Sequence, residues 1–429
     1  MARDTKKDLR NLVMYSIYVR NYSDEGTFRA VEKDLNRIKK LGVDVIWFLP
    51  IHPIGEVQRK GTLGSPYANK DYRSINPELG TLEDFKSLVD AIHSRDMKCI
   101  IDVVYNHTSP DSWLAENHPE WFYKKEDGSF GNKVGDWWDI IDLDFNQEGL
   151  WDYHIESLKY WAGIVDGFRC DVAPLIPLEF WQRARKEVSE VNSNVLWLSE
   201  SVEPSFTIIN RARGMISLSD SEIFQAFDVS YEYDIFNDFI DYFEGKSTLC
   251  RYVEKVNAQE YTYPDNYVKL RYLENHDRER IKSIIKNRTA LTNMTAFIYF
   301  QKGMTMIYAG QEVEDTNRPC LFKKDTVNWG TGYNISDLMA RLYNIKKNPL
   351  FTDSSYEVTS PVNDVLVATH TKDDNQLIGV FSTKGKGAKV PLGIPDGTYI
   401  NLISNEEFNI KHGKLALSGM PCIFEVKFI

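Results

Sequence analysis

The chain alternates between short apolar runs rich in β-branched residues and longer stretches in which apolar residues recur every three or four positions. A run of the first kind predicts a buried strand, and the second spacing predicts an amphipathic helix. Strands are predicted at residues 12–17, 43–48, 98–105, 165–170, 195–199, 225–229, 269–274 and 304–308. Helices are predicted between them, for example at residues 28–41, 82–95, 148–161 and 178–191.

This alternation predicts an α/β fold in which parallel strands are joined by crossover helices. Eight strands spread over roughly 310 residues fit a closed (β/α)8 TIM barrel better than an open doubly wound sheet. The order of the elements does not by itself distinguish the two, so closure of the barrel is an expectation.

Two segments break the pattern. Residues 108–144, after the third strand, are rich in Trp, Asp, Gly and Lys without periodicity, and long loops of this kind are usually functional. After residue 347 the chain changes to short alternating strands and Gly-containing turns, which predict an antiparallel β-sandwich. The expected domains are a barrel (residues 1–107 and 145–347), a short inserted loop domain (108–144) and a C-terminal sandwich (348–429).

Composition narrows the classes of partner and compartment. The chain has 429 residues, 42% of them hydrophobic, and a net charge of −11, which argues against nucleic-acid binding. No apolar run approaches the roughly 20 residues of a membrane span, so no membrane partner is expected. Five cysteines without a CxxC pair, and an amino terminus without an apolar leader, predict a cytoplasmic protein. A monomer is favoured, although the sequence leaves the oligomeric state open.

Polar residues gather where four of the predicted strands end. The segments are DVVYNH (102–107), GFRCDVA (167–173), LWLSES (196–201) and LENHD (273–277). The carboxyl ends of barrel strands form the face where reacting groups collect. A single carboxylate after an apolar strand is more often a turn residue or a helix cap. Four strands that end in this way favour a cleft lined with carboxylates.

Three of these carboxylates suit glycosidic cleavage, which with retention of configuration needs a nucleophilic and a proton-donating carboxyl group. Asp171, Glu200 and Asp277 can converge from three strands. Arg169 points the same way as Asp171 by strand alternation, and its guanidinium would keep Asp171 ionised. Glu200 lies between two other carboxylates, which raises its proton affinity and suits a general acid.

The four segments resemble, in order and content, the signature regions of the α-amylase family of glycoside hydrolases. Residues 42–53 (GVDVIWFLPIHP) and 303–312 (GMTMIYAGQE) are similar to its second-strand and eighth-strand motifs, and residues 65–72 (SPYANKDY) to its aromatic platform. The resemblance implies a (β/α)8 barrel with an insert after the third strand and a C-terminal β domain. It also implies an enzyme that cleaves α-1,4-glucosidic bonds in maltodextrin, starch or glycogen.

The resemblance assigns roles residue by residue. It implies that Asp171 is the nucleophile, Glu200 the acid/base, and Asp277 the carboxylate that binds hydroxyls of the sugar at the point of cleavage. It adds a substrate-binding set in which Asp102 has a structural position: Tyr67, Asp102, His107, Arg169, His276 and Arg280. A lone histidine after a strand is usually a core residue with its hydrogen bonds satisfied. His107 and His276, however, stand beside the carboxylates in matching motifs.

No cofactor is expected to be required. The resemblance makes Asn106 a calcium ligand in many family members, so calcium remains an alternative. The sequence does not single out further ligands among Asp136, Asp139, Asp142 and Asp144, and it has no run of oxygen ligands like an EF-hand. An HExxH zinc motif is also absent. We therefore expect activity without added metal.

Specificity and mode of action stay open at this level. Exo-acting α-glucosidases of the family usually carry an aspartate three residues before the platform tyrosine, where this chain has Gly64. An open cleft and an internal-cutting α-amylase are therefore favoured. The alternatives are an α-glucosidase or a 4-α-glucanotransferase with the same active site, and a non-catalytic scaffold subunit. The presence of all three carboxylates disfavours the scaffold. Trp137 in the insert either stacks on sugar or packs the insert.

Overall fold

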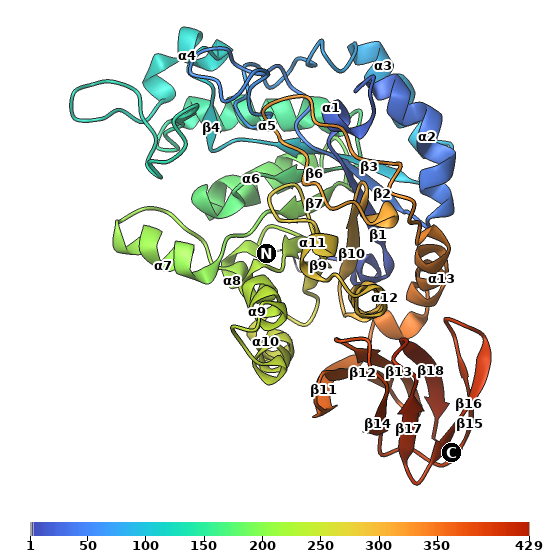
Figure 1. Ribbon diagram of the computed structural model, residues 1–429. Coiled ribbons are helices and arrows are strands. Elements are labelled where there is room, and N and C mark those ends of the chain that lie inside the picture. The colour runs from blue at the N-terminus through green and yellow to red at the C-terminus, as the bar shows by residue number, and fades with distance from the viewer. Residues whose placement is uncertain (1, 3, 429) are drawn as a thin grey trace.

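The computed structural model describes residues 2 and 4–428. Eight parallel strands close into a barrel in the order β1-β10-β9-β8-β7-β6-β3-β2 (Figure 1), which confirms the predicted TIM barrel. They are β1 (Val13–Ile17), β2 (Val45–Phe48), β3 (Lys98–Val103), β6 (Gly167–Cys170), β7 (Leu196–Ser199), β8 (Val229–Tyr231), β9 (Val268–Arg271) and β10 (Met304–Tyr308). All eight overlap their predicted ranges, but β8 shares only residue 229 with the range 225–229.

Amphipathic helices surround this barrel and bury their apolar faces against it (Figure 1). The longer ones are α2 (Phe28–Lys40), α3 (Leu82–His93), α5 (Glu148–Ala162), α6 (Leu178–Val188), α9 (Tyr233–Phe243), α10 (Leu249–Thr262), α12 (Arg288–Phe300) and α13 (Ser336–Lys346). The start of α3 is fixed by a capping box between Thr81 and Asp84, which satisfies two backbone N–H groups that the helix itself leaves free. Thr27 caps α2 in a similar way through the N–H of Ala30.

The interior of the barrel is a packed core. Apolar side chains from alternate strand positions fill it, including Met14, Trp47, Leu198, Tyr231 and Met306. A filled barrel offers no channel, so a ligand can be bound only at its ends. At Gly167 a Cβ atom would lie 2.4 Å from the carbonyl oxygen of Leu196, so the close approach of β6 and β7 requires glycine.

The segment after β3 forms a small unit of its own that starts at the carboxyl end of that strand. It contains the short strands β4 (His107–Thr108) and β5 (Ile141–Asp142), which pair antiparallel with His107 opposite Asp142. Helix α4 (Trp113–Asn117) and a 3-10 turn at Pro119–Trp121 lie between them. The insert is therefore attached to the barrel at His107, one of the residues assigned to the site.

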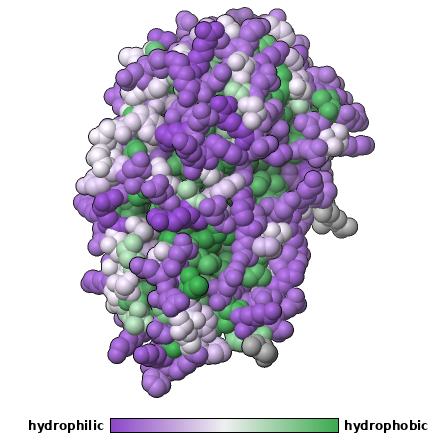
Figure 2. Space-filling view, turned by 90° about the vertical axis from the view of Figure 1, so that its right-hand side faces the viewer, coloured by the Kyte–Doolittle hydropathy of each residue, from purple (hydrophilic) through white to green (hydrophobic). Residues whose placement is uncertain are grey.

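The C-terminal module consists of two four-stranded antiparallel sheets. One contains β11 (Ser355–Val362), β12 (Val365–Lys372), β13 (Asn375–Ser382) and β18 (Cys422–Lys427), and the other β14 (Ala388–Pro391), β17 (Lys414–Leu417), β16 (Glu406–Lys411) and β15 (Gly397–Asn401). Their facing apolar residues form a separate core. A hollow lies between α13 and the second sheet, with Leu338, Ile403 and Met420 in its lining. Figure 2 shows hydrophobic residues gathered in the lower half of one face of the molecule.

No helix in the part of the chain that the structure describes is long and apolar enough to cross a lipid bilayer.

Candidate active site

One buried guanidinium gathers three carboxylates at the carboxyl end of the barrel. Arg169 on β6 lies beside Asp102 on β3 in register, and its Nη1 donates to Asp102 Oδ1 at 2.9 Å and to Asp171 Oδ1 at 2.7 Å. Its Nη2 forms an ion pair with Glu200 Oε1 at 2.9 Å. Arg169 is fully enclosed among these carboxyl groups. The predicted convergence of Arg169, Asp171 and Glu200 is therefore present in the structure.

The turn after Asp171 orients Glu200. Val172 has a φ of 35°, a left-handed conformation that a β-branched side chain rarely adopts. This conformation directs its backbone N–H to Glu200 Oε2 at 2.8 Å, across from β6 to the end of β7. Strain of this kind persists only where the surroundings impose it, and it is common at active sites. The strained turn thus fixes the second carboxyl group relative to the first.

Burial raises the pKa of both carboxyl groups of this pair. Burial, together with the nearby charges of Asp171 and Asp277, raises the pKa of Glu200 to about 8 against the opposing effect of Arg169. Burial also raises the pKa of Asp171, but the Arg169 charge and its hydrogen bond oppose the shift. With a pKa of about 8, Glu200 keeps its proton at neutral pH, as a general acid requires.

Asp277 completes the carboxylate cluster from the loop after β9. Its backbone N–H donates to Asn275 Oδ1 at 2.9 Å, and its Oδ2 lies 3.0 Å from His276 Nε2. Partial desolvation favours the neutral acid, but the charges of His276 and Arg169 outweigh it and lower the pKa of Asp277 to about 2. The Asp277 side chain is 41% exposed, so its ionised carboxylate can reach a ligand in the cleft.

Tyr67 and the two histidines lie beside these carboxylates. The Tyr67 hydroxyl donates to Asp102 Oδ2 at 3.1 Å and lies 2.7 Å from His276 Nε2, and the two rings stack with centroids 5.4 Å apart. Burial lowers the pKa of His107, although the charges of Asp142 and Asp139 oppose it, so its imidazole is neutral at neutral pH. These rings therefore supply hydrogen-bonding groups that are positioned before a ligand arrives.

Arg280 does not reach the cleft, contrary to the substrate contact that the sequence suggested, and Asp102, for which a structural position was expected, does not reach it either. Both side chains are fully enclosed. Arg280 donates to Glu274 Oε1 at 2.6 Å and to the carbonyl oxygens of Ala309 and Asn317 at 2.9 and 3.1 Å. Its guanidinium therefore connects the loops that follow β9 and β10. Asp102 accepts hydrogen bonds from Arg169 and Tyr67, so it positions those two side chains.

Several residues of the site were missed from the sequence. Tyr231 at the end of β8 accepts from Arg169 Nε at 3.3 Å, and the rings of Trp47, Tyr67 and Tyr231 surround the guanidinium at 5.2–5.6 Å. Tyr231 escaped notice because the predicted strand ended at residue 229. Trp47 could have been found, since strand alternation in residues 45–48 directs it into the barrel.

The carboxylates of the insert do not by themselves form a metal site. Asp139 Oδ1 is paired with Lys60 Nζ at 2.8 Å, and Asp142 Oδ2 accepts the N–H of Lys133 at 2.7 Å. Asn106 and Asp142 border one pocket of about 240 Å³, and Asp142 Oδ1 has no hydrogen-bond partner among the described residues. Calcium needs six to eight oxygens. No group of three or more His, Cys, Asp or Glu side chains within residues 2 and 4–428 could hold a metal ion.

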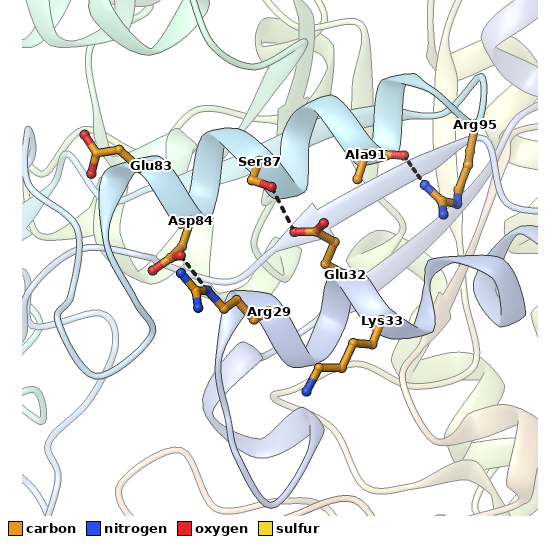
Figure 3. Close-up of a pocket in the computed structure, with 8 residues that line it drawn as sticks. All are labelled: Arg29, Glu32, Lys33, Glu83, Asp84, Ser87, Ala91 and Arg95. Atoms are coloured by element: carbon orange, nitrogen blue, oxygen red, sulfur yellow. Dashed lines mark hydrogen bonds and ion pairs between the residues drawn. The ribbon is translucent and has the colours of Figure 1, made fainter.

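A second hollow lies on the outside of the barrel between α2 and α3 (Figure 3). Its polar groups already bind one another: Arg29 pairs with Asp84 at 2.7 Å and Ser87 donates to Glu32 at 3.2 Å. These side chains belong to exposed helix faces, and no nucleophile or strongly shifted acid is among them. This hollow is a groove between two helices, whereas the reactive groups lie at the barrel end.

Comparison with known proteins agrees with this architecture. The model of the alpha-amylase catalytic domain matches residues 15–359, and that of the bacterial alpha-amylase C-terminal domain matches residues 357–424. An alpha-amylase from Lactobacillus plantarum is 46% identical, with 98% of this chain and 100% of that chain covered and a TM-score of 0.96. The noncanonic maltogenic alpha-amylase AmyB from Thermotoga neapolitana is 31% identical, with the same coverage and a TM-score of 0.88.

Curated relatives are longer and include a second activity. An alpha-1,4-glucan:maltose-1-phosphate maltosyltransferase from Picrophilus torridus is 27% identical over 83% of this chain, and the alpha-amylase MalA from Haloarcula japonica is 25% identical over 92%. In both cases the match spans 58% of the relative's length. The catalytic-domain match covers most of the chain and all of the strands that carry the carboxylate cluster. The chain therefore belongs to the alpha-amylase family.

Proposed function

We propose that the protein is a retaining glycoside hydrolase that cleaves α-1,4-glucosidic bonds within maltodextrin, starch or glycogen. The observation that carries the proposal is that Arg169 binds Asp171 and Glu200 with its two terminal nitrogens. A hydrogen-bonding contact of Glu200 also lowers the pKa of Asp171, so the two carboxyl groups are neighbours. Such proximity fits the separation of about 5 Å in retaining enzymes better than the roughly 6.5–9.5 Å of inverting ones.

The geometry suits a two-step reaction. In the first step Asp171 attacks the anomeric carbon while protonated Glu200 gives its proton to the glycosidic oxygen, and the bond between that oxygen and the anomeric carbon breaks. In the second step Glu200 takes a proton from water, which attacks the same carbon and releases Asp171. The ionised Asp277 is positioned to bind sugar hydroxyls, and Arg169 offsets the negative charge of the cluster.

Internal cleavage is supported by the residue at position 64 of the β2 loop. At position 64 the chain has glycine with a φ of 75°, and the carbonyl oxygen of Gly64 accepts from Arg20 Nη1. A side chain that could bind the non-reducing end of a glucan is therefore missing at this position. The names of the L. plantarum and H. japonica relatives, both alpha-amylases, support the same activity.

A second candidate is transfer of the glycosyl group to an acceptor other than water. The maltosyltransferase relatives favour it, because water and other acceptors react with the same covalent intermediate. For metal use we propose that no ion is required, because the Lys60 ammonium already neutralises Asp139 in the insert.

The test is digestion of maltoheptaose blocked at its non-reducing end, and of amylopectin, with product identification and NMR of the first anomer released. We expect short oligosaccharides in the α configuration from both substrates. Asp171→Asn and Glu200→Gln variants should lose this activity, and Glu254→Gln, an exposed residue of α10, is the control. An inert blocked substrate would indicate exo action, and products in the β configuration would contradict retention. Maltose 1-phosphate as donor, with glycogen as acceptor, tests the transferase alternative.

A further inference from the structure

An ion pair joins the two loops that carry Glu200 and Asp277. Glu203, three residues after Glu200, occupies the N-cap position of α7 (Pro204–Ala212), where its side chain makes no capping hydrogen bond. Its Oε1 binds Nη2 of Arg278, the residue that follows Asp277. The pair thus connects the β7 and β9 loops next to the reacting carboxylates. Neither Glu203 nor Arg278 takes part in the two-step reaction of Asp171 and Glu200.

Arg278 is held in one orientation by its surroundings. Its guanidinium lies 4.5 Å from the ring centroid of Tyr233 and 5.2 Å from that of Phe236, so two aromatic rings bind the cation from one side. Tyr233 is itself fixed, because its hydroxyl accepts from Asn275 Nδ2 at 3.1 Å. A charged group that is already ordered loses little entropy when it binds a ligand.

Each partner retains a free polar atom. Among the residues that the structure describes, no further hydrogen bond engages Arg278 Nη1 or Glu203 Oε2. The side chains are 26% and 30% exposed, so the pair is partly open to a ligand. Arg278 Nε is enclosed without a partner, which is costly for a charged group and rarely tolerated without a reason. One donor and one acceptor side by side match two neighbouring hydroxyls of a sugar.

The position of the pair relative to Glu200 identifies which sugar it can bind. Glu200 must contact the glycosidic oxygen, so the loop that continues from it borders the leaving sugar. By contrast, the Tyr67 hydroxyl contacts His276 and Asp102, and His107 pairs with Asp142 of the insert. In the second step the acceptor occupies the space that the leaving sugar has vacated.

We propose that Arg278 and Glu203 bind the leaving sugar, and in the reverse sense the sugar acceptor, and so determine how often the intermediate reacts with sugar instead of water. This inference rests on the proposed glycosidase chemistry. The ligand is a glucose unit at the reducing side of the cleaved bond. Glu203 and Arg278 are specificity-determining residues and not members of the carboxylate cluster.

The test compares two leaving groups. Glu203→Gln and Arg278→Lys variants are assayed with maltoheptaose, whose leaving group is a sugar, and with an aryl α-maltoside, whose leaving group is not. Loss of a charged hydrogen bond should lower the ratio of kcat/KM on maltoheptaose to kcat/KM on the aryl substrate by on the order of tenfold. The ratio of transfer to hydrolysis at high maltotriose concentration should fall with it.

A matched control separates this effect from loss of structure. Asp238→Asn removes the ion pair with Arg251 between the outer helices α9 and α10 and should leave both ratios as in the wild type. If the Glu203→Gln variant loses activity equally on both substrates, or loses none, its ratio of kcat/KM values is unchanged and the inference is overturned. A wild-type protein inactive on both substrates would instead refute the proposed function, so the two failures are distinguishable.

Discussion

The raised pKa of Glu200 predicts that this carboxyl group reduces stability at alkaline pH. A glutamate in the unfolded chain titrates near 4.5, whereas Glu200 in the folded protein titrates near 8 because it is buried beside Asp171 and Asp277. At about 1.4 kcal/mol for each tenfold change in the dissociation constant, the difference corresponds to about 5 kcal/mol. Between these two pH values the unfolded chain has released a proton that the folded chain keeps. Stability therefore falls as pH rises through that window and is level above it.

Glu200→Gln removes this titration while preserving the shape of the side chain. For 429 residues, an unfolding entropy of about 2 cal/mol/K per residue converts about 5 kcal/mol into roughly 5 °C. We expect the variant's Tm to exceed that of the wild type by a margin that grows by about 4 °C between pH 5 and pH 9. The assay is thermal unfolding followed by circular dichroism in buffers of equal ionic strength.

The exposed Glu254→Gln variant provides the comparison, since its margin over the wild type should not change with pH. The same preparations of the Glu200→Gln variant should show no activity on maltodextrin. A margin independent of pH, or one that shrinks toward pH 9, would refute the assignment of a buried, protonated acid at position 200.

Four further predictions concern other parts of the site. Asp171→Asn should abolish formation of the covalent intermediate and lower kcat by several orders of magnitude with an unchanged circular dichroism spectrum, and trapping with a fluorosugar followed by mass spectrometry checks this. Trp137→Ala removes a half-buried ring 5.6 Å from His107 and should raise KM for maltoheptaose on the order of fivefold; lowered stability with unchanged KM would favour packing alone. Chelator treatment should leave activity intact. Lys60→Met leaves the buried Asp139 carboxylate without its cationic partner and should lower the free energy of unfolding by about 3 kcal/mol, measured by urea unfolding.

The sequence determined the architecture because burial leaves a periodic signal. Short apolar runs that alternate with helical patterns indicated the barrel, and the structure confirms its closure. Strand alternation also placed Arg169 and Asp171 on the same side of β6, and Arg169 binds Asp171 at 2.7 Å. The position of β8 was wrong by several residues, because the apolar run before Val229 belongs to the turn that follows α8 (Asp220–Ile223).

Only the tertiary structure decided what the long polar side chains bind. Arg280 stands three residues after Asp277, yet its guanidinium turns inward to Glu274. Arg278 turns to Glu203, 75 positions earlier in the chain. Periodicity reports which face of an element is buried, but a side chain of several rotatable bonds can pair with any group that folding brings within reach. The chain's own pattern therefore specified the barrel and the ends of its strands, whereas the spatial arrangement specified the pKa of Glu200 and the partners of each arginine.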